Sequence, residues 1–315
     1  GNIVIDFATT SVFTIDSTGT STSVVTLPAI DLELAKIVVA SGDSLDASSV
    51  SNITLSGTSG TLLTQGGTFT APTNLIMNPD AAVTLTSGTV SLVSLTLSPI
   101  LNEDRVYTFG AGAISTSGDF NIAPDSAGNK ILTVNMGAAI VVAGSVGLNG
   151  ANFGVSKLDT TASNFALTAG TIAISSAGTL VANASTITLT GTGTLFTRFG
   201  TFTAGTSTVV MSPDAAVTLT SGTVTFYNLT LSPTITTNRT YTFGSGAITV
   251  SNNFTINPTA ATTTKTLTVS LGSGGLTTTE RLTIQGTGTG ISNLSTTASN
   301  YALTVGFIVL ETTGT

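Results

Sequence analysis

The chain has no histidine, cysteine or tryptophan, and only 7% of its 315 residues are Asp, Glu, Lys or Arg. Without histidine, no side chain has an unperturbed pKa near neutrality that would suit it to act as a general base. Without cysteine there is no thiol nucleophile and no disulfide, and metal sites built on His or Cys ligands are excluded. These absences predict a protein that is not an enzyme and that carries no metal and no cofactor.

The charged residues are too few and too scattered to suggest a nucleic-acid partner. Eight basic residues stand singly along the chain and the net charge is −7, so no basic patch is available for a phosphate backbone. No apolar run approaches the roughly 20 residues of a membrane-spanning helix. The composition therefore predicts neither nucleic-acid binding nor membrane insertion.

Hydroxyl side chains dominate what is present. The chain contains 66 Thr and 35 Ser, about a third of all residues, yet 41% of its residues are hydrophobic. That apolar fraction excludes a disordered chain of low hydrophobicity and high charge. The chain can bury a core.

A long internal repeat organises the sequence. Residues 77–90 recur as residues 211–224, an offset of 134, with a single difference, Asn78 against Ser212. Later segments match at the same offset, so two large copies lie in tandem. Repeats of this kind point to an architecture assembled from equivalent stacked units.

The repeat also suggests how the chain is divided. We predict one continuous β-solenoid over residues 1–315, with copy one at about 20–178 and copy two at about 179–315. The step from Thr20 to Ile53 in copy one takes 33 residues, whereas the equivalent step from Thr179 to Ile187 in copy two takes eight, so copy one carries 25 extra residues there. This difference predicts one extra coil near residues 21–50.

A shorter period predicts the fold class. Strand-like runs of alternating Thr or Ser with Val, Ile, Leu or Phe recur every 25 to 28 residues and are separated by turn residues. This is strand periodicity with turn chemistry, and a propeller blade would need about 40 to 50 residues. The pattern predicts an all-β, single-stranded parallel β-solenoid, or β-helix, of roughly 12 to 14 coils at about 25 residues per coil. Equivalent positions in the two copies should be buried, in particular Leu95 with Leu229 and Phe120 with Phe254.

Three Thr-rich strings carry a resemblance to a known class of protein. Residues 189–196, 200–210 and 227–231 resemble the β-strand-repeat segments of large bacterial cell-surface and adhesin-like secreted proteins. The resemblance implies an extracellular or cell-surface location and a structural or adhesive role. That class supplies no catalytic residues to transfer to this chain.

The carboxylates are candidates for a different function, because β-helices that bind or cleave polysaccharides use clustered acids on one face. Asp80 and Asp214 occupy the repeated Pro-Asp-Ala turn, where we expect each side chain to hydrogen-bond the backbone of its own turn. The densest charged cluster is at residues 103–105, which we interpret as a solvated loop. A third set lies in the extra coil, and we expect it on a solvated or subunit-facing surface: Asp31, Glu33, Lys36, Asp43 and Asp46.

The sequence leaves two surface properties open, glycosylation and ice binding. Six Asn-x-Ser/Thr sequons could accept covalent glycans, but roughly six are expected by chance at this Thr and Ser content. Thr-x-Thr pairs such as Thr201 with Thr203 could order water on an ice-binding face, yet they do not recur at every coil. The six sequons are at Asn52, Asn183, Asn228, Asn238, Asn253 and Asn293.

The two ends of the sequence are rich in apolar strand formers and lack a segment that resembles a cap. Exposed solenoid ends offer unpaired backbone groups over an apolar column. We therefore expect identical subunits to join head to tail as a filament. A stalk segment of a long cell-surface adhesin is the alternative, as is a clipped piece of a longer chain. The residues expected to make this contact are Ile3, Val4, Ile5, Phe307, Ile308, Val309 and Leu310.

Overall fold

The computed structural model describes residues 11–17, 22–296 and 301–311, and these residues form only β-strands and turns. The strands run parallel and stack in a β-solenoid of about 12 turns, with equivalent strands roughly 24 residues apart. The predicted fold class and coil length are confirmed. The chain forms two compact units, Gly1–Thr161 (unit 1) and Ala162–Thr315 (unit 2).

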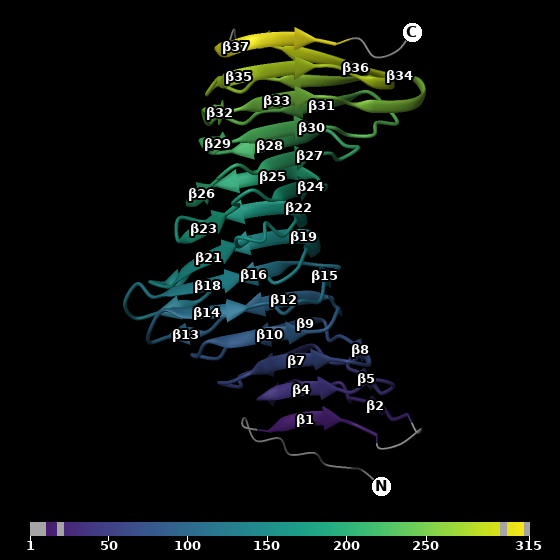
Figure 1. Cartoon of the computed structure of the whole chain (residues 1–315), viewed down its shortest axis with the longest axis vertical. Helices are drawn as coiled ribbons and strands as arrows, with labels where there is room; N and C mark the ends of the chain where they lie inside the picture. The colour runs from purple at the N-terminus through teal and green to yellow at the C-terminus, as the bar shows by residue number, and fades with distance from the viewer. Residues whose placement is uncertain (1–10, 18–21, 297–300, 312–315) are drawn as a thin grey trace. The chain divides into compact units, whose positions relative to one another are not determined.

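Unit 1 is built from strands that stack in chain order (Figure 1). Two long parallel ladders, β1-β4-β7-β10-β14-β18-β21 and β3-β6-β9-β12-β16-β19, form most of it, and β11-β15-β19, β2-β5-β8 and β13-β17-β20 form shorter ones. The bounds are β1 Val12–Ile15, β2 Val24–Thr26, β3 Leu32–Leu34, β4 Lys36–Val39, β5 Ser44–Asp46, β6 Asn52–Leu55, β7 Thr61–Gln65, β8 Thr68–Thr70, β9 Asn74–Met77, β10 Val83–Ser87, β11 Val90–Leu92, β12 Ser94–Leu97, β13 Ile100–Leu101, β14 Arg105–Thr108, β15 Ile114–Thr116, β16 Phe120–Ile122, β17 Asp125–Ser126, β18 Ile131–Asn135, β19 Ile140–Leu148, β20 Ala151–Asn152 and β21 Val155–Asp159.

Unit 2 repeats the arrangement with longer strands towards its end. Its ladders are β22-β24-β27-β30-β33-β35-β37, β22-β25-β28-β31-β34-β36, β29-β32-β35 and β23-β26, all parallel. The bounds are β22 Leu167–Ile174, β23 Gly178–Val181, β24 Thr186–Leu189, β25 Gly193–Arg198, β26 Thr201–Thr203, β27 Thr208–Met211, β28 Val217–Ser221, β29 Val224–Phe226, β30 Asn228–Leu231, β31 Arg239–Thr242, β32 Ile248–Val250, β33 Asn253–Ile256, β34 Thr259–Ser270, β35 Leu276–Ile284, β36 Thr287–Ser295 and β37 Leu303–Leu310.

The core of each unit is a set of apolar columns that run from coil to coil. Because side chains alternate across a strand, every second residue points inward and meets its equivalent on the next coil. Leu95 pairs with Phe120 in unit 1, and Leu229 pairs with Phe254 in unit 2. All four side chains are buried, which confirms the prediction made for these positions.

One turn in each copy requires glycine. Gly88 and Gly222 follow strands β10 and β28 with φ of 90° and 89°, a left-handed conformation that favours a residue without a Cβ. A Cβ at either position would also collide with a backbone carbonyl of the coil below, from Gln65 or Arg198. Two independent features therefore favour glycine at this turn in each copy, the positive φ and the close approach of a carbonyl from the coil below.

The described part of the chain contains no helix that is long and apolar enough to span a membrane.

Candidate functional site

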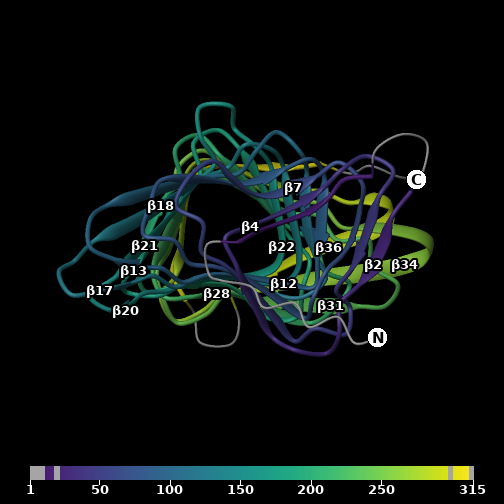
Figure 2. The same cartoon turned by 90° about the horizontal axis from the view of Figure 1, so that it is seen from below.

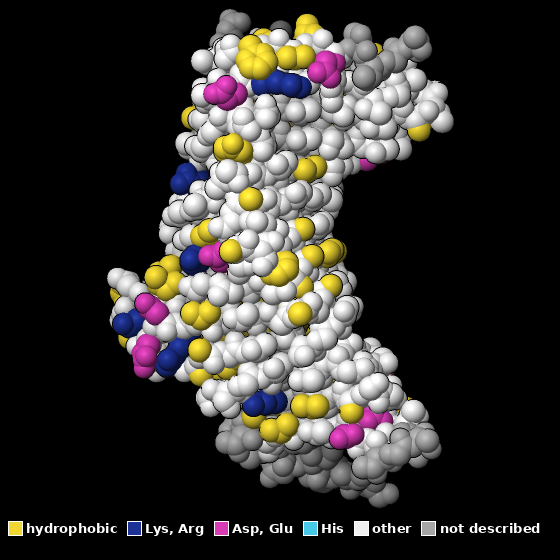
Figure 3. Space-filling model, in the orientation of Figure 1, with side chains coloured by type: hydrophobic (Ala, Val, Ile, Leu, Met, Phe, Trp, Pro, Cys, Tyr) yellow, Lys and Arg dark blue, Asp and Glu magenta, His cyan; other side chains and the backbone are white. Residues whose placement is uncertain are grey.

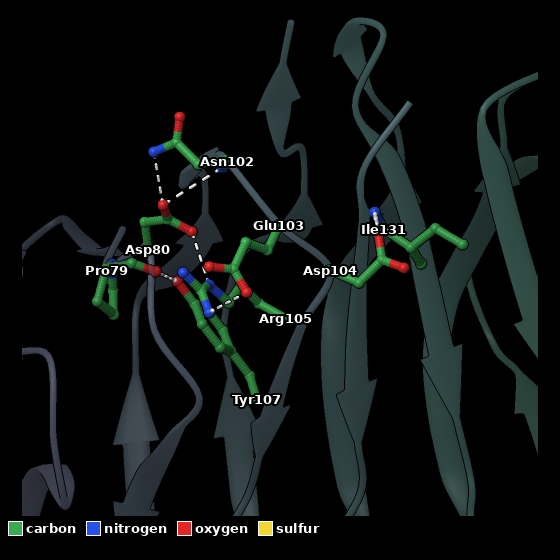
Figure 4. Close-up of polar contacts among 8 residues, drawn as sticks. All are labelled: Pro79, Asp80, Asn102, Glu103, Asp104, Arg105, Tyr107 and Ile131. Atoms are coloured by element: carbon green, nitrogen blue, oxygen red, sulfur yellow. Dashed lines mark hydrogen bonds and ion pairs between the residues drawn. The ribbon is translucent and has the colours of Figure 1, made fainter. Parts of the chain in front are cut away.

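The most connected polar cluster of unit 1 links two successive coils around Asp80 (Figure 4). Its Oδ1 accepts a hydrogen bond from Arg105 Nε at 2.7 Å, and its Oδ2 accepts one from Asn102 Nδ2 at 2.7 Å. The Tyr107 hydroxyl donates to the carbonyl oxygen of Pro79. We call this arrangement the Asp–Arg–Tyr clamp.

Unit 2 contains the same clamp 134 residues later. Arg239 Nε donates to Asp214 Oδ1 at 2.7 Å, and Thr236 Oγ1 donates to Asp214 Oδ2 at 2.6 Å. The Tyr241 hydroxyl donates to the Pro213 carbonyl oxygen at 2.5 Å. Thr236 therefore does with a hydroxyl what an Asn amide does in copy one.

We predicted that each of the two repeated aspartates would hydrogen-bond the backbone of its own turn. Each does accept a backbone N–H, from Asn102 at 3.3 Å or from Thr236 at 3.2 Å, but this donor and the side-chain donors lie one coil further along the chain. The predicted contact with the backbone is confirmed, and the predicted turn is wrong. The hydrogen bond from Arg105 holds the pKa of Asp80 below its ordinary value, and that from Arg239 does the same for Asp214. Burial raises the pKa of Tyr107 and of Tyr241, so both phenols stay protonated and can donate.

Asn102 and the two tyrosines were not predicted as site residues, although the sequence contains a signal for the tyrosines. Each tyrosine lies 28 residues after the proline whose carbonyl it binds, in both copies. Such a spacing is about one coil, which places the two residues above one another once the coil length is known.

The three residues of the charged loop at 103–105 make different contacts. Glu103 approaches Arg105 at 3.4 Å, whereas Asp104 Oδ1 accepts the backbone N–H of Ile131 at 2.9 Å. Glu103 is largely exposed, as expected of a solvated loop, but Arg105 belongs to the clamp. Of the two acids in this loop, only Asp104 contacts the next coil, because Glu103 approaches Arg105 within the loop itself.

The charged residues of the extra coil do not converge on one point. Asp43 is buried and accepts hydrogen bonds from the backbone N–H and hydroxyl of Ser17 and from the N–H of Ser23. Asp31 accepts two from Asn52, and Asp46 accepts one from the N–H of Ser48. These hydrogen bonds hold the pKa of Asp43, Asp31 and Asp46 below the ordinary value.

No cluster of three or more metal-ligating side chains occurs within residues 11–17, 22–296 and 301–311. A groove of about 590 Å³ runs across β8, β11 and β15 of unit 1, and its wall is formed by Ser and Thr hydroxyls over Phe69, Leu92 and Val93. No charged residue lines it. The groove offers shape and hydroxyl groups, without an acid or a base.

The six sequons differ in how much of the asparagine is available. Asn238 and Asn293 are exposed, and the other four are partly buried. Among these, Asn52 donates its side-chain amide to Asp31, and Asn228 donates its own to Thr208. The structure thus leaves Asn238 and Asn293 as the most accessible acceptors.

The residues expected at the assembly contact lie partly on β37. Ile3, Val4 and Ile5 fall outside the described residues. Phe307, Ile308 and Leu310 are 51%, 52% and 74% exposed, and Val309 is half-buried. Figure 3 shows apolar side chains gathered with acidic and basic ones over β35 and β37.

No protein family, curated protein or solved structure matches this chain.

Proposed function

We propose that the protein is a non-enzymatic structural subunit of an extracellular filament, in which the β37 coil of one copy is continued by a coil of the next. The observation that supports this is the exposure of core columns at β37. In the column Phe254, Leu282, Ile308, the first two side chains are buried and the last is 52% exposed. The column ends in solvent.

The backbone of β37 supports the same contact. The N–H of Glu311 donates to the carbonyl oxygen of Ile284 at 3.0 Å, so it faces β35. Because backbone groups alternate along a strand, those of Ile308 and Leu310 face the opposite side. Within the described residues β37 pairs with β35 alone, which leaves an edge that accepts another parallel strand.

The exposed apolar side chains of β37 favour a second copy of this chain as the binding partner. An adjoining coil must place Leu, Ile or Val over Ile308 and Leu310 and offer a parallel strand to their backbone. The coils within the described residues have these properties. A heterologous contact of this kind does not close on itself and propagates as a fibre.

A stalk segment of a long cell-surface adhesin is the second candidate, and the resemblance of the Thr-rich strings supports it. There the coil after β37 belongs to the same polypeptide. The full-length gene distinguishes the two, because a stalk requires further copies of the repeat in one reading frame.

The test replaces one of two neighbouring residues with equal exposure. Ile308→Glu places a carboxylate on the open column. Phe307, which the sequence analysis expected at the contact, lies on the outer face opposite Arg281 in the strand register, so Phe307→Glu places the carboxylate outside that column. We expect the purified wild type and Phe307→Glu to form filaments by electron microscopy, and Ile308→Glu to sediment as a monomer. A wild type that stays monomeric at its highest soluble concentration, or equal assembly of the two variants, would contradict the proposal.

The non-enzymatic part of the proposal has its own test. We expect purified protein to release no reducing ends or unsaturated products from acidic or neutral polysaccharides. Turnover that Asp80→Ala or Asp214→Ala abolishes would overturn this, because both carboxylates are assigned here to the stacking of coils.

A further inference from the structure

A second surface, on the flank of unit 1, carries side chains that the stacking of coils does not explain. The short strands β13, β17 and β20 lie together at one side of unit 1 (Figure 2). They pair in parallel, so Ile100, Asp125 and Ala151 form one row and Leu101, Ser126 and Asn152 form the next. Leu101 and Ser126 are buried, whereas Asn152 in the same row is exposed. In the other row Ile100 and Ala151 are exposed and Asp125 is half-buried.

This flank combines two exposed apolar side chains with a carboxylate and an amide. Ile100 is 70% exposed and Phe153 is 60% exposed. Together with Asp125, Asn152, Ser126 and Ala127 they line a cavity of about 420 Å³. Apolar walls with a few polar groups are the usual composition of a small-ligand site.

The polar groups are held in place. Asp125 Oδ1 accepts hydrogen bonds from the N–H of Ser126 at 2.6 Å and from Asn152 Nδ2 at 2.7 Å, and Oδ2 lies 2.9 Å from the same nitrogen. The amide nitrogen of Asn152 therefore points at Asp125. Its carbonyl oxygen accepts no hydrogen bond from the described part of the chain and is free to accept one from a ligand.

The internal repeat shows that the fold does not need these side chains. The pairing of Ile100 with Asp125 recurs in copy two as a bridge between Thr234 and Thr259. Both apolar and acidic character are lost there, while the backbone pairing is kept. The solenoid tolerates threonine at these two positions.

The second half of the flank shows the same divergence. Ser126 pairs with Asn152 in copy one, and Ala260 pairs with Gly288 at the equivalent place, with φ of 49° at Asn152 and 63° at Gly288. The residue after each is Phe153 in copy one and Thr289 in copy two. The backbone conformation is therefore shared, and the exposed aromatic ring belongs to copy one alone.

We propose that this flank binds a pyranose ring of a polysaccharide. A pyranose has an apolar C–H face, which packs on the Phe153 ring and on Ile100, and equatorial hydroxyls at its rim. The carboxylate of Asp125 accepts from one hydroxyl, and the carbonyl oxygen of Asn152 accepts from another. The inference is independent of filament formation, because it uses no residue of β37.

The repeat provides the variants that test the site. Phe153→Thr and Asp125→Thr introduce the residues that copy two carries at the same backbone positions, so both should fold. Phe199→Thr is the matched control, since Phe199 is 71% exposed on the turn between β25 and β26 of unit 2. Thermal unfolding of all three should match that of the wild type.

Binding is measured by the retardation of each protein in native gels. The gels are cast with soluble starch, xylan, mannan, galactomannan or chitosan. We expect at least one polymer to retard the wild type and Phe199→Thr equally. Phe153→Thr and Asp125→Thr should each weaken the apparent affinity by about tenfold, the change that about 1.4 kcal/mol produces.

Three outcomes would overturn the assignment. The first is that no polymer retards the wild type, and the second is that Phe153→Thr is retarded as strongly as the wild type. The third is that Phe153→Thr changes the sedimentation of the protein without sugar, which would assign the flank to contacts between copies. If the protein bound sugar as expected but formed no filaments, the proposed function would be wrong and the sugar-binding site would still be supported.

Discussion

The two buried tyrosines of the Asp–Arg–Tyr clamps should make the protein lose stability in alkali. Tyr107 and Tyr241 are fully buried, and each donates its hydroxyl to a proline carbonyl of the coil below. Burial raises the pKa of both phenols in the folded state. In the unfolded chain they ionise near the ordinary value of about 10.

The sign follows from proton linkage. Below about pH 10 the phenols are protonated in both states, so their contribution to folding is fully present. Above it the unfolded chain releases protons that the folded chain retains, and the free energy of unfolding falls as the pH rises. By pH 11 the loss is about 1.4 kcal/mol for each tyrosine and about 2.8 kcal/mol for the pair.

The variant Tyr241→Phe turns this into a measurement. At pH 8 it removes a hydrogen bond and leaves the Pro213 carbonyl without that donor, so we expect it to be about 1 to 2 kcal/mol less stable than the wild type. At pH 11 the wild type has lost about 1.4 kcal/mol that the variant has not lost, so the difference should shrink to nearly zero.

Urea unfolding followed by circular dichroism at pH 8, 10 and 11 measures the free energies. The double variant Tyr107→Phe with Tyr241→Phe should show twice the effect, because the two clamps share no residue. All ionisable groups other than the replaced tyrosine are the same in the wild type and the variant, so their effects cancel in the difference. A stability difference that is the same at pH 8 and pH 11 would refute the burial of the phenols in the folded state.

Three further outcomes are expected. Gly222→Ala should lower the free energy of unfolding by about 1 to 3 kcal/mol, because φ is positive and a carbonyl blocks the Cβ; Gly128→Ala, where a Cβ meets open space, is the control and should be neutral in the same urea titration. Asp80→Asn and Asp214→Asn should each be less stable than the wild type at pH 7. The lowered pKa of each aspartate means that its contribution is present above about pH 4 and is lost as the pH falls through the folded-state value, so the difference in thermal unfolding should shrink as the pH is lowered below about 4. Deleting residues 1–7 should stop filament growth in electron micrographs without changing thermal unfolding, and unchanged growth would argue against terminal strands as the contact.

The fold could be predicted because its strands, turns and inward-facing side chains recur at a regular spacing along the sequence. A repeat of about 25 residues, alternating apolar and hydroxyl side chains and regular turns leave few alternatives to a parallel solenoid. The inward positions followed from alternation within a strand, and Leu95 and Leu229 illustrate this. Both lie at the same phase of the repeat and both are buried.

The polar sites could not be predicted to the same degree, because the length of each coil varies. Paired residues on successive coils are 20 apart from Leu75 to Leu95, 25 apart from Leu95 to Phe120 and 26 apart from Phe120 to Val146. Without the register, the local turn was the natural partner for the aspartate of each clamp. The exposure of Ile100 could not be predicted either, because a strand of two residues is too short for the alternation of apolar and polar residues to show which face is exposed to solvent.

The clamps also determine where an opening of the stack should stop. In a stack of coils each coil is stabilised by its two neighbours, so unfolding advances from an open edge one interface at a time. From β37 it would cross β35 and β34 and then reach β31, where Arg239 and Tyr241 add side-chain bonds to the backbone ladder of the coil below. The clamp cross-links adjacent turns through side chains. The segment on its C-terminal side can therefore unfold locally while the rest of unit 2 remains folded.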